Sequence, residues 1–271
     1  MTLSVIIPNY NNAHFLETCL DSVLEQTFRP TEIIVVDDCS TDASREIIHR
    51  YEAQHETVRG IYLPKNGGVS HARNVGLTAA TGEYATTLDG DDFYYNPQKL
   101  ENEMRLIREK GGNVLTYSKL VYCNTDNQII RYLDYKKKAY FQGDILEDLL
   151  TERITKTLMR DCCYPRQAAL DAGLYDEQSC LFEDYDFLIR LAERLPFYCT
   201  FSYGTAYRRK DFGLSQRPLS EVLQAKDCVI VANIERQPKE NQKRLMRCYL
   251  RNKRYTNMKR WIKRQFKRKR A

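Results

Sequence analysis

Short apolar runs alternate with amphipathic segments along the first third of the chain. Four apolar runs, each ended by polar residues, are residues 3–7, 32–36, 60–63 and 84–88. Continuous runs of this length are typical of strands that are buried on both faces of a sheet. The segments between them place apolar side chains at helical spacing, as Leu16, Leu20 and Val23 do. A strand and a helix about every 30 residues predict a mostly parallel sheet covered by helices on both faces.

The rest of the chain mixes helices and strands less regularly. A helix is predicted from Pro97 to about Glu109, and an amphipathic helix is predicted over residues 182–194. The polar, Tyr- and Lys-rich residues 118–143 predict either a hairpin or a variable insert. Helical pattern resumes at Pro218 and becomes increasingly basic. Further predicted elements are strands at 114–117 and 197–207 and a helix at 144–152.

Polar clusters follow each of the four predicted strands in the first part of the chain. In mostly parallel sheets, ligands bind beyond the carboxyl ends of the strands. Because four separate strands present polar groups at the same edge, we expect a binding site there. The clusters are Asn9-Tyr10-Asn11, Asp37-Asp38, Lys65-Asn66 and Asp89 to Asp92.

The segment Asp89-Gly90-Asp91-Asp92 carries the clearest chemistry. Carboxylates two residues apart on a loop reach one cation, and glycine permits the tight backbone. A divalent cation held there would bridge a diphosphate and neutralise its charge. The alternative is a solvated acidic turn. A position at a strand end, opposite Asp37 and Asp38, favours the cation site.

These segments together resemble a known family. The chain is similar to the inverting family 2 glycosyltransferases of GT-A fold over roughly residues 1–215. The resemblance implies a nucleotide-binding half at 1–95, an acceptor half at 96–217 and a helical extension at 218–271. The matching segments are residues 4–11, 36–42, 66–74, 88–92 and 182–186, with Arg190 after the last.

The resemblance assigns the donor side of the site. It implies that Pro8 and Tyr10 line the nucleotide pocket and that Asp38 bonds the uracil edge. Each has a structural alternative: Pro8 would only end a strand, Tyr10 would only pack, and Asp38 would only cap the following turn. The predicted nucleotide and donor-binding set is completed by Asn11, Asn66, Arg73, Asp89, Gly90 and Asp91.

Within that set the resemblance gives charged residues separate roles. Asp89 would contact the ribose or the sugar, and Asp91 would bind Mn²⁺ or Mg²⁺ on the diphosphate. Arg73 would lie near the phosphates or the donor sugar, or would only pair with a surface acid.

Asp184 is the predicted catalytic base. Inverting transfer is a direct displacement, so the attacking hydroxyl loses its proton on the face opposite the leaving nucleotide. A carboxylate at a helix start after Leu181-Phe182 suits that role. Glu183 and Asp186 are the alternative bases, and stabilisation of the helix N-terminus is the structural alternative.

One position departs from the family pattern. Similar proteins often carry His three residues after the Tyr of a Tyr-Arg pair, whereas Tyr207-Arg208-Arg209 is followed by Lys210. A protonated lysine does not bind a metal, but it makes a possible diphosphate contact. The QxxRW motif of polymerising relatives is also absent, which favours transfer of one or a few sugars.

The positive charge is concentrated in the last residues. Residues 251–271 hold 11 of the 42 Lys and Arg and no acid, so the remainder has 31 basic against 36 acidic residues, a net charge of −5. A basic amphipathic helix there predicts an anchor to an anionic membrane surface, and nucleic-acid binding is the alternative. No nucleic acid is expected, because the body is acidic. The predicted anchor residues are Tyr255, Met258, Trp261, Ile262 and Phe266.

The sequence thus predicts an inverting glycosyltransferase that uses a UDP-sugar and a saccharide or lipid-linked saccharide acceptor. The N-terminus lacks signal-peptide features, no run of 18 apolar residues occurs, and the nine cysteines show no CxxC pair. We therefore expect a cytoplasmic protein held at the inner face of the cell membrane, with Cys162 and Cys163 simply buried. The alternatives are a non-catalytic nucleotide-sugar-binding protein and a nucleic-acid-binding protein. A sugar nucleotidyltransferase is disfavoured, because residues 8–12 contain no glycine.

Overall fold

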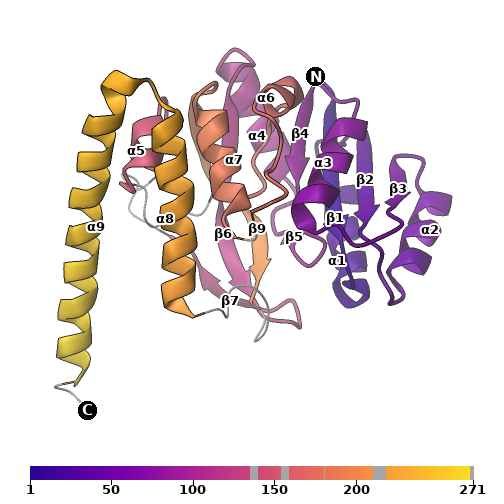
Figure 1. Ribbon diagram of the computed structural model, residues 1–271. Coiled ribbons are helices and arrows are strands. Elements are labelled where there is room, and N and C mark those ends of the chain that lie inside the picture. The colour runs from indigo at the N-terminus through magenta and orange to yellow at the C-terminus, as the bar shows by residue number, and fades with distance from the viewer. Residues whose placement is uncertain (135–139, 154–158, 180, 210–217, 269–271) are drawn as a thin grey trace.

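A five-stranded sheet forms the N-terminal part of the computed structural model (Figure 1). The structure describes residues 1–134, 140–153, 159–179, 181–209 and 218–268, with side chains as far as Lys253. Four strands of this sheet are parallel and the last is antiparallel, which confirms the mostly parallel sheet. In order across the sheet they are β3 (Val58–Tyr62), β2 (Glu32–Asp37), β1 (Leu3–Asn9), β4 (Tyr84–Thr87) and β8 (Tyr164–Pro165).

Alternate side chains of the central strands enter two different core clusters. Val5 and Ile7 of β1 join one cluster, and Ile6 between them joins the other. This follows from the strand period of two, which sends successive side chains to opposite faces. The first cluster includes side chains of α1 (Ala13–Leu24), α2 (Ser44–Gln54) and α4 (Lys99–Glu109), and the second includes those of α3 (Val69–Ala79).

Helix α3 packs very closely on β1. A Cβ atom at Gly76 would lie 2.4 Å from Cγ2 of Ile6, so no larger residue fits there without movement. This close approach sets the distance between α3 and the strands β1 and β2.

A second sheet of four strands was not predicted from the sequence. Strands β6 and β9 are parallel, while β5 and β7 pair antiparallel with them. The β6–β7 pairing confirms the hairpin interpretation of residues 118–143. Register shifts near Tyr117 and Lys119 interrupt the alternation of inward and outward side chains by which a strand is predicted from sequence. The order is β5 (Phe93–Tyr94), β9 (Phe197–Arg208), β6 (Leu115–Cys123) and β7 (Ile129–Tyr132).

The remaining helices cover the C-terminal part. Leu188, Leu191 and Leu195 are buried on one side of the α7 segment, as its pattern predicts. Ile234 of α8 and Tyr249 of α9 belong to the same core cluster as α7, so both helices pack on the body. The described helices include none that could cross a membrane. These helices are α5 (Leu146–Leu150), α6 (Arg166–Asp171), α7 (Glu183–Ala192), α8 (Leu219–Arg236) and α9 (Lys239–Arg268).

The cysteines of the described part are free thiols. Cys162 and Cys163 are buried with 4% and 0% exposure, which confirms that they are core side chains. Burial raises the pKa of both thiols well above the usual range, so they are poor nucleophiles.

Candidate active site

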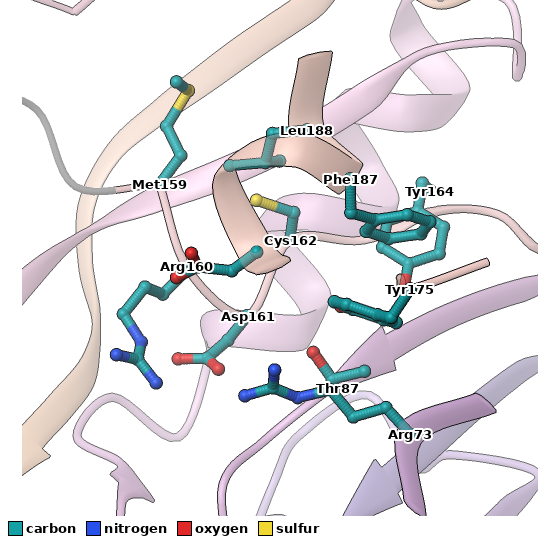
Figure 2. A pocket seen from close by; sticks show the side chains of 11 residues that line it. Arg73, Thr87, Met159, Arg160, Asp161, Cys162, Tyr164, Tyr175, Phe187 and Leu188 are labelled. Carbon is teal, nitrogen blue, oxygen red and sulfur yellow. The ribbon is translucent and has the colours of Figure 1, made fainter. Parts of the chain in front are cut away.

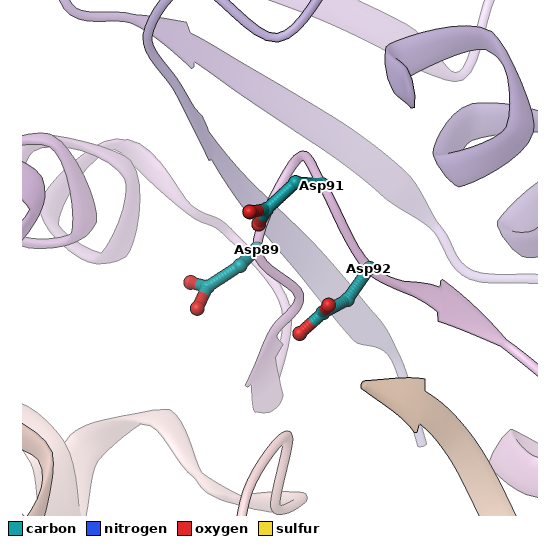
Figure 3. A group of neighbouring side chains, drawn as sticks. All are labelled: Asp89, Asp91 and Asp92. Atoms are coloured by element: carbon teal, nitrogen blue, oxygen red, sulfur yellow. The ribbon is translucent and has the colours of Figure 1, made fainter. Parts of the chain in front are cut away.

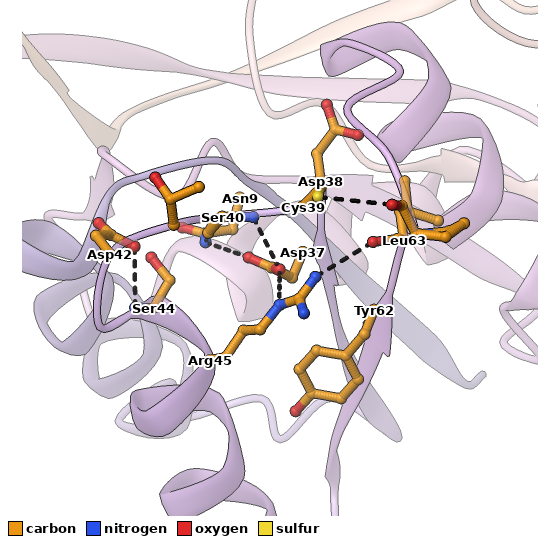
Figure 4. Close-up of polar contacts among 12 residues, drawn as sticks. Asn9, Asp37, Asp38, Cys39, Ser40, Asp42, Ser44, Arg45, Tyr62 and Leu63 are labelled. Atoms are coloured by element: carbon orange, nitrogen blue, oxygen red, sulfur yellow. Dashed lines mark hydrogen bonds and ion pairs between the residues drawn. The ribbon is translucent and has the colours of Figure 1, made fainter.

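The polar residues at the ends of β1 and β2 bond to one another (Figure 4). The Asn9 Nδ2 donates to Asp37 Oδ1 at 3.2 Å, and Arg45 Nε donates to Asp37 Oδ2 at 2.7 Å. Arg45 also donates to the carbonyl of Leu63 at 3.2 Å. Asp37 is fully buried, so its carboxylate holds the two strand ends together rather than facing a ligand.

Asp38 points away from Asp37 and holds the loop before α3 (Figure 4). Its two carboxylate oxygens accept the backbone N–H groups of Gly67 and Gly68, at 2.7 and 2.8 Å. Gly68 has φ of 88°, a backbone conformation that favours glycine. Asn66 Nδ2 donates to the Asp38 carbonyl at 3.3 Å. The predicted uracil contact of Asp38 stays a prediction, and the carboxylate also has this structural role.

The loop after β1 lies against the other strand ends. Asn11 has a φ of 52° and its side chain accepts the N–H of Thr41 at 2.8 Å. The Pro8 carbonyl accepts the N–H of Gly90 at 3.2 Å. Tyr10 is 47% exposed, so its ring does not pack in the core. These contacts bring Pro8, Tyr10, Asn11 and Gly90 to one edge of the sheet, and their contact with a nucleotide stays a prediction.

Three carboxylates gather on the loop after β4 (Figure 3). Oxygen atoms of Asp89, Asp91 and Asp92 lie within 4.8 Å of one another. Carboxylate oxygens are the ligands that Mn²⁺ and Mg²⁺ prefer. Asp92 is 1% exposed, and burial raises its pKa well above the usual range. The cluster fits a divalent cation by the chemistry of its donors.

Two arginines hold the Asp89 carboxylate. Arg73 donates to Oδ1 at 2.6 Å, and Arg160 pairs with Oδ2. Arg73 also bonds Glu183 at 3.0 Å, which links the Asp-rich loop to the start of α7. Burial opposes ionisation of Asp89, but the two guanidinium groups outweigh it and hold its pKa at about 2. Arg73 therefore pairs with site carboxylates and is only 6% exposed, so the alternative of a surface ion pair is wrong.

A small cavity of about 30 Å³ lies beside this ion-pair network (Figure 2). Arg73 and Asp184, which the sequence analysis assigned to opposite sides of the reaction, both line it. Arg160 and Asp161 line it as well. The other lining residues are Thr87, Met159, Cys162, Tyr164, Tyr175, Phe187 and Leu188.

The three acids at the start of α7 have different surroundings. Asp184 lines the cavity, and Glu183 is bonded by Arg73. Burial and then the Asp184 charge raise the pKa of Glu183. Asp186 is buried and pairs instead with Arg190 at 2.7 Å and with Asn233 at 2.7 Å. Asp186 is therefore a structural residue that joins α7 to α8, and the geometry favours Asp184 over it.

Three charged residues of the site were not identified in the sequence. Arg160 stacks over Tyr207 at 4.5 Å and pairs with Asp89, while Asp161 lines the cavity. Arg208 donates its backbone N–H to Asp92 at 2.8 Å and its Nε to the Asp91 carbonyl at 2.6 Å. The available signal for Arg160 and Asp161 was that two charged residues directly precede Cys162 and Cys163, which were expected to be buried.

Other predicted residues lie beyond this description. Lys210 lies outside the described residues, so its diphosphate contact stays a prediction. The anchor residues lie in the part of α9 after Lys253, where no side chain is described, so their contact with a membrane stays a prediction.

Comparison with known proteins decides the family. The model of glycosyl transferase family 2 matches residues 4–172. The chain belongs to this family. A relative from Bacillus subtilis, the putative teichuronic acid biosynthesis glycosyltransferase TuaG, is 41% identical over 108 residues, which cover 40% of this chain and 42% of TuaG. An uncharacterized glycosyltransferase of Rickettsia typhi, RT0329, is 30% identical over 188 residues, covering 68% of this chain and 56% of RT0329.

Solved structures show the same fold. The crystal structure of S. aureus TarS 1–349 with UDP-GlcNAc matches with a TM-score of 0.72 and 22% identity, covering 92% of this chain and 72% of that one. The complex of TarS 1–349 with UDP matches with a TM-score of 0.69. Family 2 membership and the GT-A fold are thus established. The chain spans less than two thirds of the length of the curated relatives it matches.

Proposed function

We propose that the chain is an inverting glycosyltransferase that moves a sugar from a UDP-sugar to a saccharide or glycolipid acceptor in the synthesis of cell-surface glycans. Asp184 is the general base, and Asp91 holds the metal-bound diphosphate. Family membership supports the reaction class, and TarS, which has the same fold, forms crystals in complex with UDP and with UDP-GlcNAc.

One observation carries the proposal. Arg73 bonds Asp89 of the Asp-rich loop and Glu183 beside Asp184 at the same time, at 2.6 and 3.0 Å. The groups assigned to the leaving diphosphate and the group assigned to the attacking hydroxyl therefore share one cleft. Direct displacement needs them on opposite sides of a single sugar carbon.

The chemistry of the chain's own groups follows from this arrangement. The acceptor oxygen forms a bond to the anomeric carbon while the bond from that carbon to the diphosphate oxygen breaks. Asp184 takes the acceptor proton, and the bond electrons leave with UDP. Attack on the face opposite the diphosphate converts an α-linked donor into a β-linked product. Asp184 lies at the edge of a cavity that Phe187 and Leu188 line on its apolar side.

A divalent cation fits beside Asp91. Both carboxylate oxygens of Asp89 already pair with arginines, which favours Asp91 over Asp89 as a ligand. When bound, Mn²⁺ or Mg²⁺ would neutralise charge on the diphosphate. Arg73 and Arg160 supply further positive charge on the same side, in a buried setting where such charge has a large effect.

Release of UDP from a panel of UDP-sugars tests the reaction. Asp184→Asn should lower kcat by about 10²–10⁴-fold, because it removes the base but keeps the shape. It should still bind UDP. Asp91→Ala should raise the Mn²⁺ concentration needed for half-maximal turnover and weaken UDP binding.

The matched control is Asp171→Asn, which makes the same change at an exposed position of α6. It should turn over like wild type. Wild-type turnover in folded Asp184→Asn would remove Asp184 as the base, and Glu183 would be tested next. Wild-type metal response in Asp91→Ala would remove the metal role.

The basic end of α9 supports attachment to an anionic membrane. We propose that residues 254–271 bind acidic lipid and so bring the enzyme to a lipid-linked acceptor on the cytoplasmic face. The structure indicates where to truncate, because Asn252 donates to the Thr151 carbonyl at 2.8 Å and Lys253 pairs with Asp227. A chain that ends at Lys253 should keep UDP-sugar hydrolysis but should no longer sediment with phosphatidylglycerol vesicles. Full sedimentation of the truncated chain would contradict the anchor. Loss of binding to a DNA duplex instead would favour the nucleic-acid alternative.

A further inference from the structure

Asp161 is a buried carboxylate with an unused hydrogen-bonding atom. Its exposed fraction is 7%, and its Oδ2 has no hydrogen-bond partner among the residues that the structure describes. It lines the same cavity as Arg73 and Asp184. Figure 2 shows its carboxylate extending to the same side as the guanidinium groups of Arg73 and Arg160. A buried carboxylate oxygen without a donor is costly, so a donor from a ligand would be favourable there.

The backbone of Asp161 is held firmly in a left-handed conformation. Its φ is 50°, and its carbonyl accepts hydrogen bonds from Lys99 Nζ at 2.6 Å and Thr86 Oγ1 at 3.1 Å. Lys99 is itself 1% exposed and pairs with buried Glu103 at 3.1 Å. Three buried polar side chains thus fix a main-chain position that non-glycine residues adopt at a cost. Such over-determined conformations cluster at functional sites.

The surroundings select a neutral donor over a cation. The positive charges of Arg160 and Lys99 both act on the Asp161 carboxyl. These two charges precede the opposing charge of Asp89 in their effect on Asp161, so a second cation is disfavoured there. Asp161 is not a member of the carboxylate cluster of the Asp-rich loop. A hydroxyl group is neutral, donates one hydrogen bond and fits a cavity of about 30 Å³.

We propose that Asp161 recognises the donor sugar, with its carboxylate accepting a hydrogen bond from one sugar hydroxyl group. The inference rests on the proposed function, because it places the sugar between the Asp-rich loop and Asp184. A sugar attached to the diphosphate would lie beside Asp89 and Arg73, and Asp161 closes the same cavity. Asp161 is then a specificity-determining residue, and Lys99 is the residue that positions it.

The protonation state agrees with this role. Burial raises the pKa of Asp161 to about 6, although Arg160 and Lys99 oppose the rise. Near neutral pH the group is a carboxylate and therefore only accepts hydrogen bonds.

Calorimetric titration separates sugar recognition from nucleotide recognition. UDP, UDP-glucose, UDP-galactose, UDP-GlcNAc and UDP-GalNAc are titrated with Mn²⁺ into wild type, Asp161→Ala, Asp161→Asn and the control Asp171→Asn. We expect Asp161→Ala to bind UDP as wild type does but to lose about 10- to 100-fold in affinity for the preferred UDP-sugar, as for a hydrogen bond to a charged group. Asp161→Asn keeps the shape and one acceptor, so its loss should be smaller.

A second measurement changes the ligand as well as the protein. Removal of one hydroxyl group from the preferred UDP-sugar should weaken its binding to wild type by the same factor as the Asp161→Ala substitution does. Asp161→Ala should bind this deoxy analogue and the parent UDP-sugar with equal affinity. Equal affinity of wild type and Asp161→Ala for all UDP-sugars would overturn the inference. So would an equal loss for UDP and UDP-sugars. Failure of wild type to bind any nucleotide would overturn the proposed function as well, so the two failures are distinguishable.

Discussion

The two parts of the molecule contribute to the site in different ways. In the loop before α3, a side chain bonds to backbone groups, as Asp38 does to Gly67 and Gly68. At the junction with the second part, side chains pair with oppositely charged side chains, as Asp89 does with Arg73 and Arg160. Contacts of the first kind fix the shape of a loop, and contacts of the second kind hold charged groups in place. The loop that Asp38 holds is therefore fixed by the protein's own backbone contacts, whereas the junction holds charges that neutralise one another.

The largest expected effect comes from breaking the charge network. Asp89→Ala leaves Arg73 and Arg160 without their shared partner in a largely buried place. Loss of one member of such a network costs about 3–5 kcal/mol. Urea denaturation should show this loss in the free energy of unfolding. A matched change at exposed Glu83, Glu83→Ala, should alter it little. Equal effects of the two variants would show that the network contributes nothing to stability.

Removing Asp161 should change how stability depends on pH. Its folded-state pKa of about 6 lies above the ordinary value of 3.8, so the folded protein binds the proton more tightly than the unfolded chain. Stability from this group is fully present below about pH 4 and is lost as pH rises through 6. Asn does not titrate, so Asp161→Asn should not lose this stability as pH rises. Its free energy of unfolding relative to wild type should therefore rise by on the order of 3 kcal/mol from pH 4 to pH 7.5. Parallel pH profiles of the two proteins, measured by urea denaturation, would contradict this.

The packing of the first part is tested by Gly76→Ala. The added Cβ would lie 2.4 Å from Ile6 Cγ2, so α3 must move away from β1. Overpacking of this kind costs about 1–3 kcal/mol. The shift should also weaken UDP binding, since α3 carries Arg73. Alanine at the exposed Thr78 position of the same helix serves as the control. Thermal unfolding and UDP titration of both variants check the result.

The smallest effect is expected at the C-terminus. A chain ending at Lys253 keeps Tyr249, Asn252 and Lys253 in their contacts with the body. Its free energy of unfolding should differ from wild type by less than about 0.5 kcal/mol, as for surface changes away from such features. A larger loss would show that residues 254–271 contribute to folding.

The first sheet could be predicted because its strands are short, apolar and followed by helices. Residues 32–36 were predicted as a strand, and β2 is Glu32–Asp37. The second sheet could not be predicted, because β6 pairs with β9 about 80 residues later in the chain. A local sequence pattern indicates a strand but does not indicate its distant partner. A bulged strand also loses its period of two. The same reason applies to Arg160 and Asp161. Their roles depend on the tertiary contacts of Arg160 with Asp89 and of Asp161 with Lys99. No spacing of residues in the sequence predicts these contacts.

Helix α9 begins beside the body and continues past it as one uninterrupted element of 30 residues, about 45 Å in length (Figure 1). In that view its end and the carboxyl ends of the parallel strands point to the same side of the molecule. A continuous helix of this kind is a spacer of fixed length and not a flexible linker. Each turn added to or removed from α9 would change its length by about 5.4 Å. The length of α9 would therefore limit how far the body can lie from a surface that binds residues 254–271.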